Sequence, residues 1–321
     1  MPELPEVETI RRGLTECITR QAIKRIDVAC AKSFQGDPAT VTGATITTLR
    51  RFGKALVIDL DNQISLMIHL RMTGQLIYDP VSLSAPIAKP TTTIPATPTT
   101  PTPTAPTTPT SRYAAGHPSA NFTATLPNRQ TRVTLALTRG VLYFNDQRKF
   151  GFIKPIKTTE VMHDPFIEKL APDPWHLTPD ALYASLARHP HSQIKPTLLD
   201  QTIIAGLGNI YVDETLFASR IHPEERCANI TRDQAADLIK NAQQIMETSI
   251  ASGGSTFETY VKPDGTTGDY LDAFAQVFNR TGQPCPVCHT PIQKIKVAGR
   301  GTHFCPRCQP LSITRKGTNH D

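Results

Sequence analysis

The sequence predicts an α+β protein of several domains: a β-rich N-terminal domain, a helical second domain and a C-terminal hairpin that carries cysteines. Three observations support this. Short apolar runs end at turn residues in the first half, helical periodicity follows, and two Cys-x-x-Cys pairs lie near the end. A length of 321 residues exceeds the usual single domain of about 100–200 residues. With no apolar run near the ~18 residues of a membrane span and no secretory signal, we expect a cytoplasmic protein.

Strands are predicted on both sides of a break in composition. Ala55–Leu60 and Ile64–Leu70 are apolar runs bounded by turn residues. After the break, Arg132–Leu137 and Val141–Asn145 flank the Arg139-Gly140 turn and so predict a hairpin. The simplest interpretation is one β-sandwich domain that is interrupted by an insertion.

The break itself spans residues 80–120 and is dominated by threonine and proline. From Thr91 to Thr110, 17 of 20 residues are one or the other, which removes amide donors and excludes a helix or a central strand. A segment of this composition buries too little apolar surface to offset its ordering entropy. It therefore predicts a disordered, partly polyproline-II spacer, with a docking segment for a partner as the alternative.

The second domain is predicted to be helical. Asp233–Ile250 carries apolar residues three and four positions apart, which is typical of an amphipathic helix. Upstream, Pro196–Pro223 predicts a short helix, a glycine-containing turn at Gly206–Asn209 and a second helix from about Ile210. Glycines and free amides at a helix N-terminus suit a phosphate group, although plain packing is the alternative.

Four cysteines near the C-terminus predict a zinc site. Two Cys-Pro-x-Cys pairs with sixteen residues between them supply four thiolates for one tetrahedral ion: Cys285, Cys288, Cys305 and Cys308. A redox thiol pair is the alternative. The intervening segment is basic, and the chain has 34 Lys and Arg against 28 Asp and Glu. This mild positive excess favours a polyanionic partner such as nucleic acid.

The N-terminal run Met1–Thr9, MPELPEVET, resembles the start of the bacterial formamidopyrimidine-DNA glycosylases. Further motifs match that family in the same order: GKALVIDL, HLRMTG, NDQRKFG, AGLGNIYVDE, SGGST and the CPVC/CPRC finger. The resemblance covers nearly the whole chain except residues 79–120. It implies an N-terminal β-sandwich with flanking helices over residues 1–157, a helix–two-turn–helix domain over 158–278, a zinc finger over 279–312 and a flexible tail over 313–321.

The resemblance also implies an activity. A member of this family is a bifunctional DNA glycosylase and abasic-site lyase of base excision repair, which removes 8-oxoguanine and formamidopyrimidines through an N-terminal proline Schiff base and cuts the strand by β,δ-elimination. We expect a monomer at the nucleoid that acts on double-stranded DNA with oxidised bases or abasic sites and holds one structural Zn²⁺. Two alternatives remain: an endonuclease VIII-like glycosylase for oxidised pyrimidines, whose start motif differs, and a damage-binding paralogue without catalysis.

The catalytic residues implied by the family are Pro2, Glu3, Lys54 and Arg300. Removal of Met1 leaves Pro2 with a free α-amine, which at pH 7 is about 10% unprotonated, compared with about 0.04% for an ordinary lysine. A secondary amine that attacks C1′ yields an iminium, which acidifies the 2′ proton for elimination. Glu3 can donate a proton to the opening sugar ring if burial raises its pKa. Lys54 and Arg300 are expected at phosphates or in the eliminations.

The DNA-binding residues implied by the family include three side chains that fill the space left by an everted base: Met72, Arg148 and Phe150. Asn209 is expected to bind DNA as well. The family's His-x-His pair is replaced here by Gln130-Thr131-Arg132, so one backbone contact is expected to be lost or remade by Arg132. One residue also differs from the family motif in His69–Met72 and two differ in Asp146–Lys149. We expect these changes to affect lesion preference and affinity more than activity.

Overall fold

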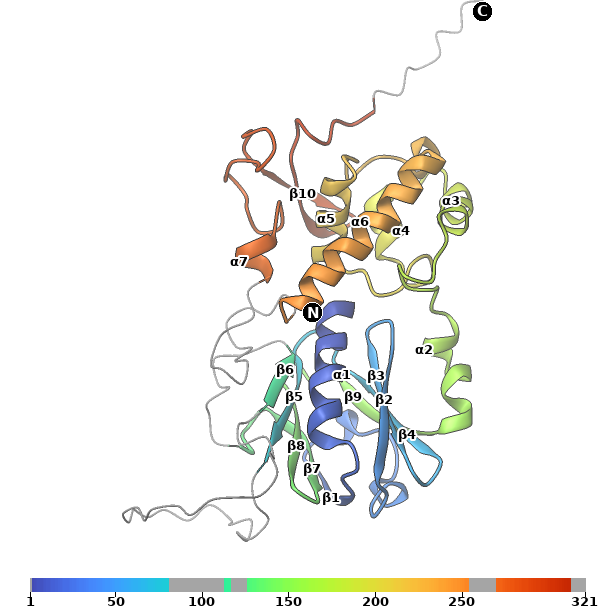
Figure 1. The fold of residues 1–321 in the computed structure, drawn as a ribbon, viewed down its shortest axis with the longest axis vertical. Coiled ribbons are helices and arrows are strands. Elements are labelled where there is room, and N and C mark those ends of the chain that lie inside the picture. The colour runs from blue at the N-terminus through green and yellow to red at the C-terminus, as the bar shows by residue number, and fades with distance from the viewer. Residues whose placement is uncertain (1, 81–112, 117–125, 254–269, 313–321) are drawn as a thin grey trace, which may run out of the picture.

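The computed structural model describes residues 2–80, 113–116, 126–253 and 270–312. The N-terminal part is a sandwich of two antiparallel sheets with helix α1 beside them (Figure 1), which confirms the predicted sandwich. One sheet has the order β1-β7-β8-β5-β6 and the other β2-β3-β4-β9. The strands are β1 (Ile23–Val28), β2 (Ile46–Phe52), β3 (Ala55–Leu60), β4 (Ile64–His69), β5 (Gly74–Asp79), β6 (Tyr113–Gly116), β7 (Thr131–Leu137), β8 (Gly140–Asp146) and β9 (Phe152–Lys157).

Helix α1 (Leu4–Ile18) closes the sandwich core along one apolar stripe. The stripe consists of residues three or four positions apart, each at most 1% exposed: Val7, Ile10, Leu14 and Ile18. Strand β3 lies in the middle of its sheet, and all six of its residues are buried, which explains its continuous apolar run. The predicted strands before and after the insertion therefore pack into one core.

The predicted spacer at residues 80–120 needs a correction, because a strand occurs within it. Strand β6 pairs antiparallel with β5 at the edge of the five-stranded sheet. Its Tyr113 hydroxyl donates to the Thr9 carbonyl of α1 at 3.1 Å, and its ring fills the space beside Gly13. The strand could not be predicted from composition, because it forms through pairing with β5 and through the contact of one aromatic residue, Tyr113, with α1. The threonine–proline run itself lies outside the described residues.

The second domain is helical, as predicted, with helices α2 (Pro165–Glu168), α3 (Pro179–Ala187), α4 (Ile194–Leu199), α5 (Asn209–Ala218), α6 (Arg232–Ala251) and α7 (Tyr270–Phe274). Short 3-10 turns cover Ala31–Ser33, Pro38–Thr40, Thr158–His163 and Cys227–Asn229. Thr231 caps α6 by accepting the Gln234 amide at 3.2 Å. Leu4 of α1 belongs to the core of this domain and not to that of the sandwich. The first turn of α1 therefore lies at the junction of the two domains (Figure 1).

The C-terminal part is a small hairpin of β10 (Gln293–Val297) and β11 (Arg300–Phe304). Its core is formed by the cysteines with Phe217, Val277 and Ile292. Glu214 of α5 accepts three consecutive backbone amides, those of Gln276, Val277 and Phe278. The chain that leads into the hairpin is thereby attached to the helical domain. Within the described ranges, no helix is long and apolar enough to cross a membrane.

Candidate active site and zinc finger

The first residues of α1 are held by the turn that precedes α5. The Leu4 amide donates to the Gly206 carbonyl at 3.1 Å, and Glu3 Oε1 accepts the Ile210 amide at 3.0 Å. Gly206 has φ +95°, and a Cβ there would lie 2.3 Å from the Leu4 side chain. A Cβ on Gly208 would lie 2.3 Å from Glu3 Cδ. The glycines therefore allow the backbone to approach Glu3 and Leu4, a role that the phosphate interpretation of this turn did not include.

Glu3 is a buried carboxyl group, 2% exposed. Burial raises its pKa to about 7, opposed first by the charge of Lys54 and reinforced by Glu6. Among the described residues, its Oε2 has no hydrogen-bond partner. Glu3 therefore exchanges its proton near neutral pH and keeps one oxygen free for a ligand.

Lys54 and Arg300 lie around this carboxyl group. Lys54, in the β2–β3 turn, is buried and donates through Nζ to the Leu207 carbonyl at 2.7 Å. Burial lowers its pKa, and the positive charge of Arg300 contributes to the decrease. Arg300 is exposed at the start of β11, while Pro2 is buried beside Glu3. The structure thus brings Pro2, Glu3 and Lys54 together at the domain junction, with Arg300 at its rim.

A buried lysine that the sequence analysis missed connects this region to the hairpin. Lys195 Nζ is fully buried and donates to Asp213 Oδ1 at 2.6 Å, to Thr302 Oγ1 at 2.8 Å and to the Gly301 carbonyl at 3.2 Å. The other oxygen of Asp213 accepts the His303 amide at 2.9 Å. The available signal was a lysine and an aspartate in two helical segments that are mostly apolar, IKPTLL and NIYVDETLFA. This network attaches β11, and with it Arg300, to α4 and α5.

Asn209 takes part in the same attachment. Its amide nitrogen donates to the Gly301 carbonyl at 3.0 Å. Its Oδ1 is buried without a partner among the described residues. In this structure, the side-chain amide nitrogen of Asn209 is therefore used to hold the hairpin, and its Oδ1 atom remains as an acceptor.

The three predicted probes lie together, although the chain separates Met72 from the other two. Arg148 Nη1 lies 3.1 Å from Met72 Sδ, and its guanidinium lies over the Phe150 ring at 5.0 Å from the centroid. Met72 is 41% exposed and Phe150 is 55% exposed. Large apolar side chains that remain exposed beside an arginine are suited to insertion into a base stack.

Asp146 organises the loop that carries two of these probes. Its fully buried carboxylate accepts the amides of Arg148, Phe150 and Gly151 at 3.0, 2.8 and 2.7 Å. Arg132 donates through Nε to the Asp146 carbonyl at 2.6 Å and through Nη1 to the Arg129 carbonyl at 2.9 Å. One donor nitrogen of Arg132 therefore supports the probe loop, and another holds the turn before β7. This role of Asp146 could not be predicted from the sequence, because most of its partners are backbone amides.

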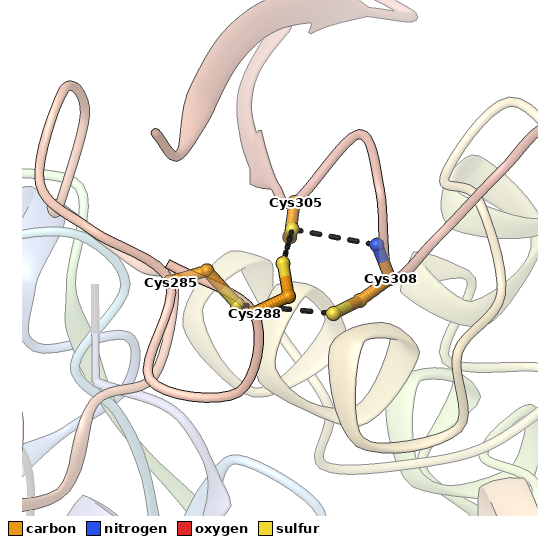
Figure 2. Close-up of side chains that lie close together, drawn as sticks. All are labelled: Cys285, Cys288, Cys305 and Cys308. Carbon is orange, nitrogen blue, oxygen red and sulfur yellow. Dashed lines mark hydrogen bonds between the residues drawn. The ribbon is translucent and has the colours of Figure 1, made fainter. Parts of the chain in front are cut away.

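The four predicted zinc ligands converge (Figure 2). All four Sγ atoms lie within 4.8 Å of one another. The Cys285–Cys308 sulfur distance is 3.8 Å and the Cys288–Cys305 distance is 3.4 Å. A tetrahedral site with Zn–S bonds of about 2.3 Å needs sulfur separations of about 3.8 Å. Amides of Val287 and Cys308 point at the sulfurs of Cys285 and Cys305, both at 3.4 Å. The residues fit a closed, structural Zn²⁺ site.

The sandwich is joined to a helical domain, with a buried acid where the two domains meet and a cysteine finger at the C-terminal end. This arrangement is that of a DNA glycosylase. Three family models match the chain: the formamidopyrimidine-DNA glycosylase N-terminal domain over residues 1–153, the H2TH domain of the same enzymes over 170–261, and the zinc finger found in FPG and IleRS over 282–311. The chain belongs to the formamidopyrimidine-DNA glycosylase family of base excision repair.

Relatives and solved structures agree with this assignment. The formamidopyrimidine-DNA glycosylase of an Exiguobacterium species is 36% identical over 96% of this chain and 99% of its own. Lactococcus lactis Fpg in complex with abasic-site DNA has a TM-score of 0.77 at 32% identity, covering 96% of this chain and 99% of its own. MutM in complex with DNA that contains carbocyclic 8-oxo-G has a TM-score of 0.75 at 32% identity, covering 96% and 100%. As in the matched finger family, the four cysteines bind one structural Zn²⁺.

Proposed function

We propose that this protein excises 8-oxoguanine and formamidopyrimidines from double-stranded DNA and then cleaves the strand by β,δ-elimination, with Pro2 as the nucleophile. The observation that carries the proposal is the buried Glu3 carboxyl group, whose pKa is raised to about 7, beside Pro2 and Lys54. A carboxylic acid that titrates near neutral pH can donate a proton under the conditions in which an α-amine is partly unprotonated.

In the proposed chemistry, the Pro2 nitrogen, freed by loss of Met1, forms a bond to C1′ of the damaged nucleotide. The glycosidic C1′–N bond breaks and the base departs with its electron pair, while Glu3 gives its proton to the ring oxygen as the sugar opens. The resulting iminium accepts electrons when the 2′ proton is removed, so the 3′ phosphate leaves with the electrons of its C3′–O bond. Removal of the 4′ proton from the conjugated iminium then expels the 5′ phosphate. Lys54 and Arg300 provide positive charge for these phosphates.

The probe residues supply the second half of the proposal. Met72, Arg148 and Phe150 would occupy the position of the everted base, which offsets part of the cost of a few kcal/mol for unstacking it. Asn209 and Arg132 are proposed to line the same DNA-binding face. The Zn²⁺ would keep the finger folded and take no part in the chemistry.

Borohydride trapping tests this function. The protein should become covalently attached to a duplex with 8-oxoguanine opposite cytosine, and the adduct should map to the N-terminal peptide that begins with Pro2. A protein extended at its N-terminus is the matched control and should not form the adduct. Trapping confined to an oxidised-pyrimidine duplex would favour the endonuclease VIII-like alternative. Binding without an adduct would favour the non-catalytic paralogue.

We also propose domain limits of 1–157, 158–278 and 279–312, with a tail over 313–321 that lies outside the described residues. All three family matches fall inside these limits, and the match to the H2TH domain ends at residue 261. We propose that the protein acts as a monomer on DNA in the nucleoid.

A further inference from the structure

The catalytic end of α1 is held by the helical domain, although α1 packs on the sandwich for most of its length. Leu4 lies in the helical core, and Glu3 accepts an amide of α5. A third connection runs through Glu6, on the first turn of α1. We propose that Tyr211 is a positioning residue for the Pro2 nucleophile and that it acts through Glu6. This inference rests on the proposed function.

The connection is a continuous chain of short hydrogen bonds. Glu6 Oε2 accepts the Glu3 amide at 2.7 Å. Glu6 Oε1 accepts the Tyr211 hydroxyl at 2.5 Å, and that hydroxyl lies 2.6 Å from Ser249 Oγ. Glu6 is 7% exposed, and Tyr211 and Ser249 are fully buried. Water therefore competes little for these bonds, and the three side chains form one connected network.

The geometry explains why this chain reaches the nucleophile. The Glu3 amide that Glu6 holds is bonded directly to the Pro2 carbonyl carbon, and the peptide group between them is planar. Fixing that amide fixes the peptide plane and the Pro2 Cα. One backbone torsion, ψ of Pro2, then remains to orient the ring nitrogen. A small rotation of Glu6 would move the nitrogen away from C1′, and a misplacement of about 1 Å can cost about 100-fold in rate.

Tyr211 is suited to hold Glu6 because its hydroxyl remains protonated. Burial raises the pKa of Tyr211 well above its ordinary value, and the neighbouring Glu6 carboxylate raises it further. The hydroxyl therefore keeps its proton and donates it in the hydrogen bond to Glu6. Phenylalanine would fill the same space in the helical core, so the hydroxyl can be removed with little change in packing.

Tyr211 belongs to α5 and Ser249 to α6, whereas Glu6 lies in the first turn of α1 and Pro2 directly before that helix. The position of the nucleophile therefore depends on the packing of α1 against the helical domain. A change in that packing would alter the reaction even where every catalytic residue is intact.

The test is Tyr211→Phe in the full-length, zinc-loaded protein. Single-turnover borohydride trapping on a duplex with a preformed abasic site should slow by about tenfold or more at saturating enzyme, as expected for loss of a hydrogen bond to a charged group. The Kd for a duplex with a tetrahydrofuran site should stay within about twofold. Tyr183→Phe is the matched control, because Tyr183 is 40% exposed on α3, and it should change neither quantity.

Ser249→Ala provides a second variant that removes the support behind the Tyr211 hydroxyl. Ser249→Ala should slow trapping by a smaller factor than Tyr211→Phe does. The double variant should trap at nearly the same rate as Tyr211→Phe alone. A normal trapping rate for Tyr211→Phe would overturn the inference. A slower trapping rate that is matched by an equal rise in the Kd for the tetrahydrofuran duplex would also overturn it. If Tyr211→Phe does not fold, normal trapping by Ser249→Ala would overturn it instead. Failure of the proposed function is distinguishable, because the wild-type adduct would then be absent or map away from Pro2.

Discussion

Gly208 leaves space for the carboxyl group of Glu3, because a Cβ at Gly208 would lie 2.3 Å from Glu3 Cδ. The φ of Gly208 is –130°, within the range open to other residues. Glycine is therefore needed here for space and not for backbone conformation. The contact joins the turn before α5 to the residue that we propose as the proton donor.

Gly208→Ala should lower single-turnover excision of 8-oxoguanine by at least about tenfold, because the new methyl group displaces Glu3 from the Ile210 amide. Gly43→Ala is the control: Gly43 has φ +90° and nothing within 4 Å of its Cβ position. It should cost about 1 kcal/mol of stability and leave excision unchanged. Equal excision by wild type and Gly208→Ala would show that Glu3 needs no fixed position.

The ratio of base excision to abasic-site cleavage should fall as the pH rises through about 7. Excision needs protonated Glu3, whose pKa is raised to about 7 by burial, while both reactions need unprotonated Pro2. The protonation of the amine affects both rates equally and cancels in their ratio. Above the pKa of Glu3, the ratio should therefore fall by up to about tenfold per pH unit. Glu3→Gln should retain abasic-site cleavage, and its residual ratio should not depend on pH. A flat wild-type ratio between pH 6 and 8.5 would argue against Glu3 as the proton donor.

Asp213→Asn should destabilise the helical domain and its attachment to the finger by about 3–5 kcal/mol. The substitution leaves the fully buried Lys195 ammonium group without its carboxylate. Lys195→Met combined with Asp213→Leu removes both charges and should recover much of this loss. Urea unfolding of the zinc-loaded protein measures both effects. If the single and double variants were equally destabilised, the burial of an unpaired charge would not be the cause.

Deletion of Thr91–Thr110 should leave excision and melting temperature nearly unchanged, because loop-closure free energy varies by only about 0.6 kcal/mol per doubling of loop length. Deletion of residues 82–119 should lower the melting temperature, since it also removes β6 and the Tyr113 contact with α1. Tyr113→Ala in the full chain separates these effects and should reproduce part of the loss. A stable 82–119 deletion would show that β6 contributes nothing to the fold.

Much of the fold could be predicted from local patterns. The apolar run at Ala55–Leu60 predicted β3, and the periodicity at Asp233–Ile250 predicted α6, because each element's burial is visible in its own residues. The spacing of Cys285, Cys288, Cys305 and Cys308 predicted the zinc site for a similar reason, since two tight turns supply the ligands. The motifs at the N-terminus and in the finger also predicted the family.

Other features depended on contacts between residues far apart in the chain. The raised pKa of Glu3 comes from its burial under the 206–210 turn, some 200 residues away. The support of the probe loop by Asp146 and the burial of Lys195 arise when separate elements pack together. The sequence by itself determined which residue types were present, and it predicted the elements whose burial pattern is local, such as β3 and α6, but not β6. The tertiary structure decided which of those side chains were buried away from water, and so decided their pKa values, because desolvation depends on all the elements that surround a group. It also decided the position of Pro2, because that position depends on how α1 packs against the helical domain.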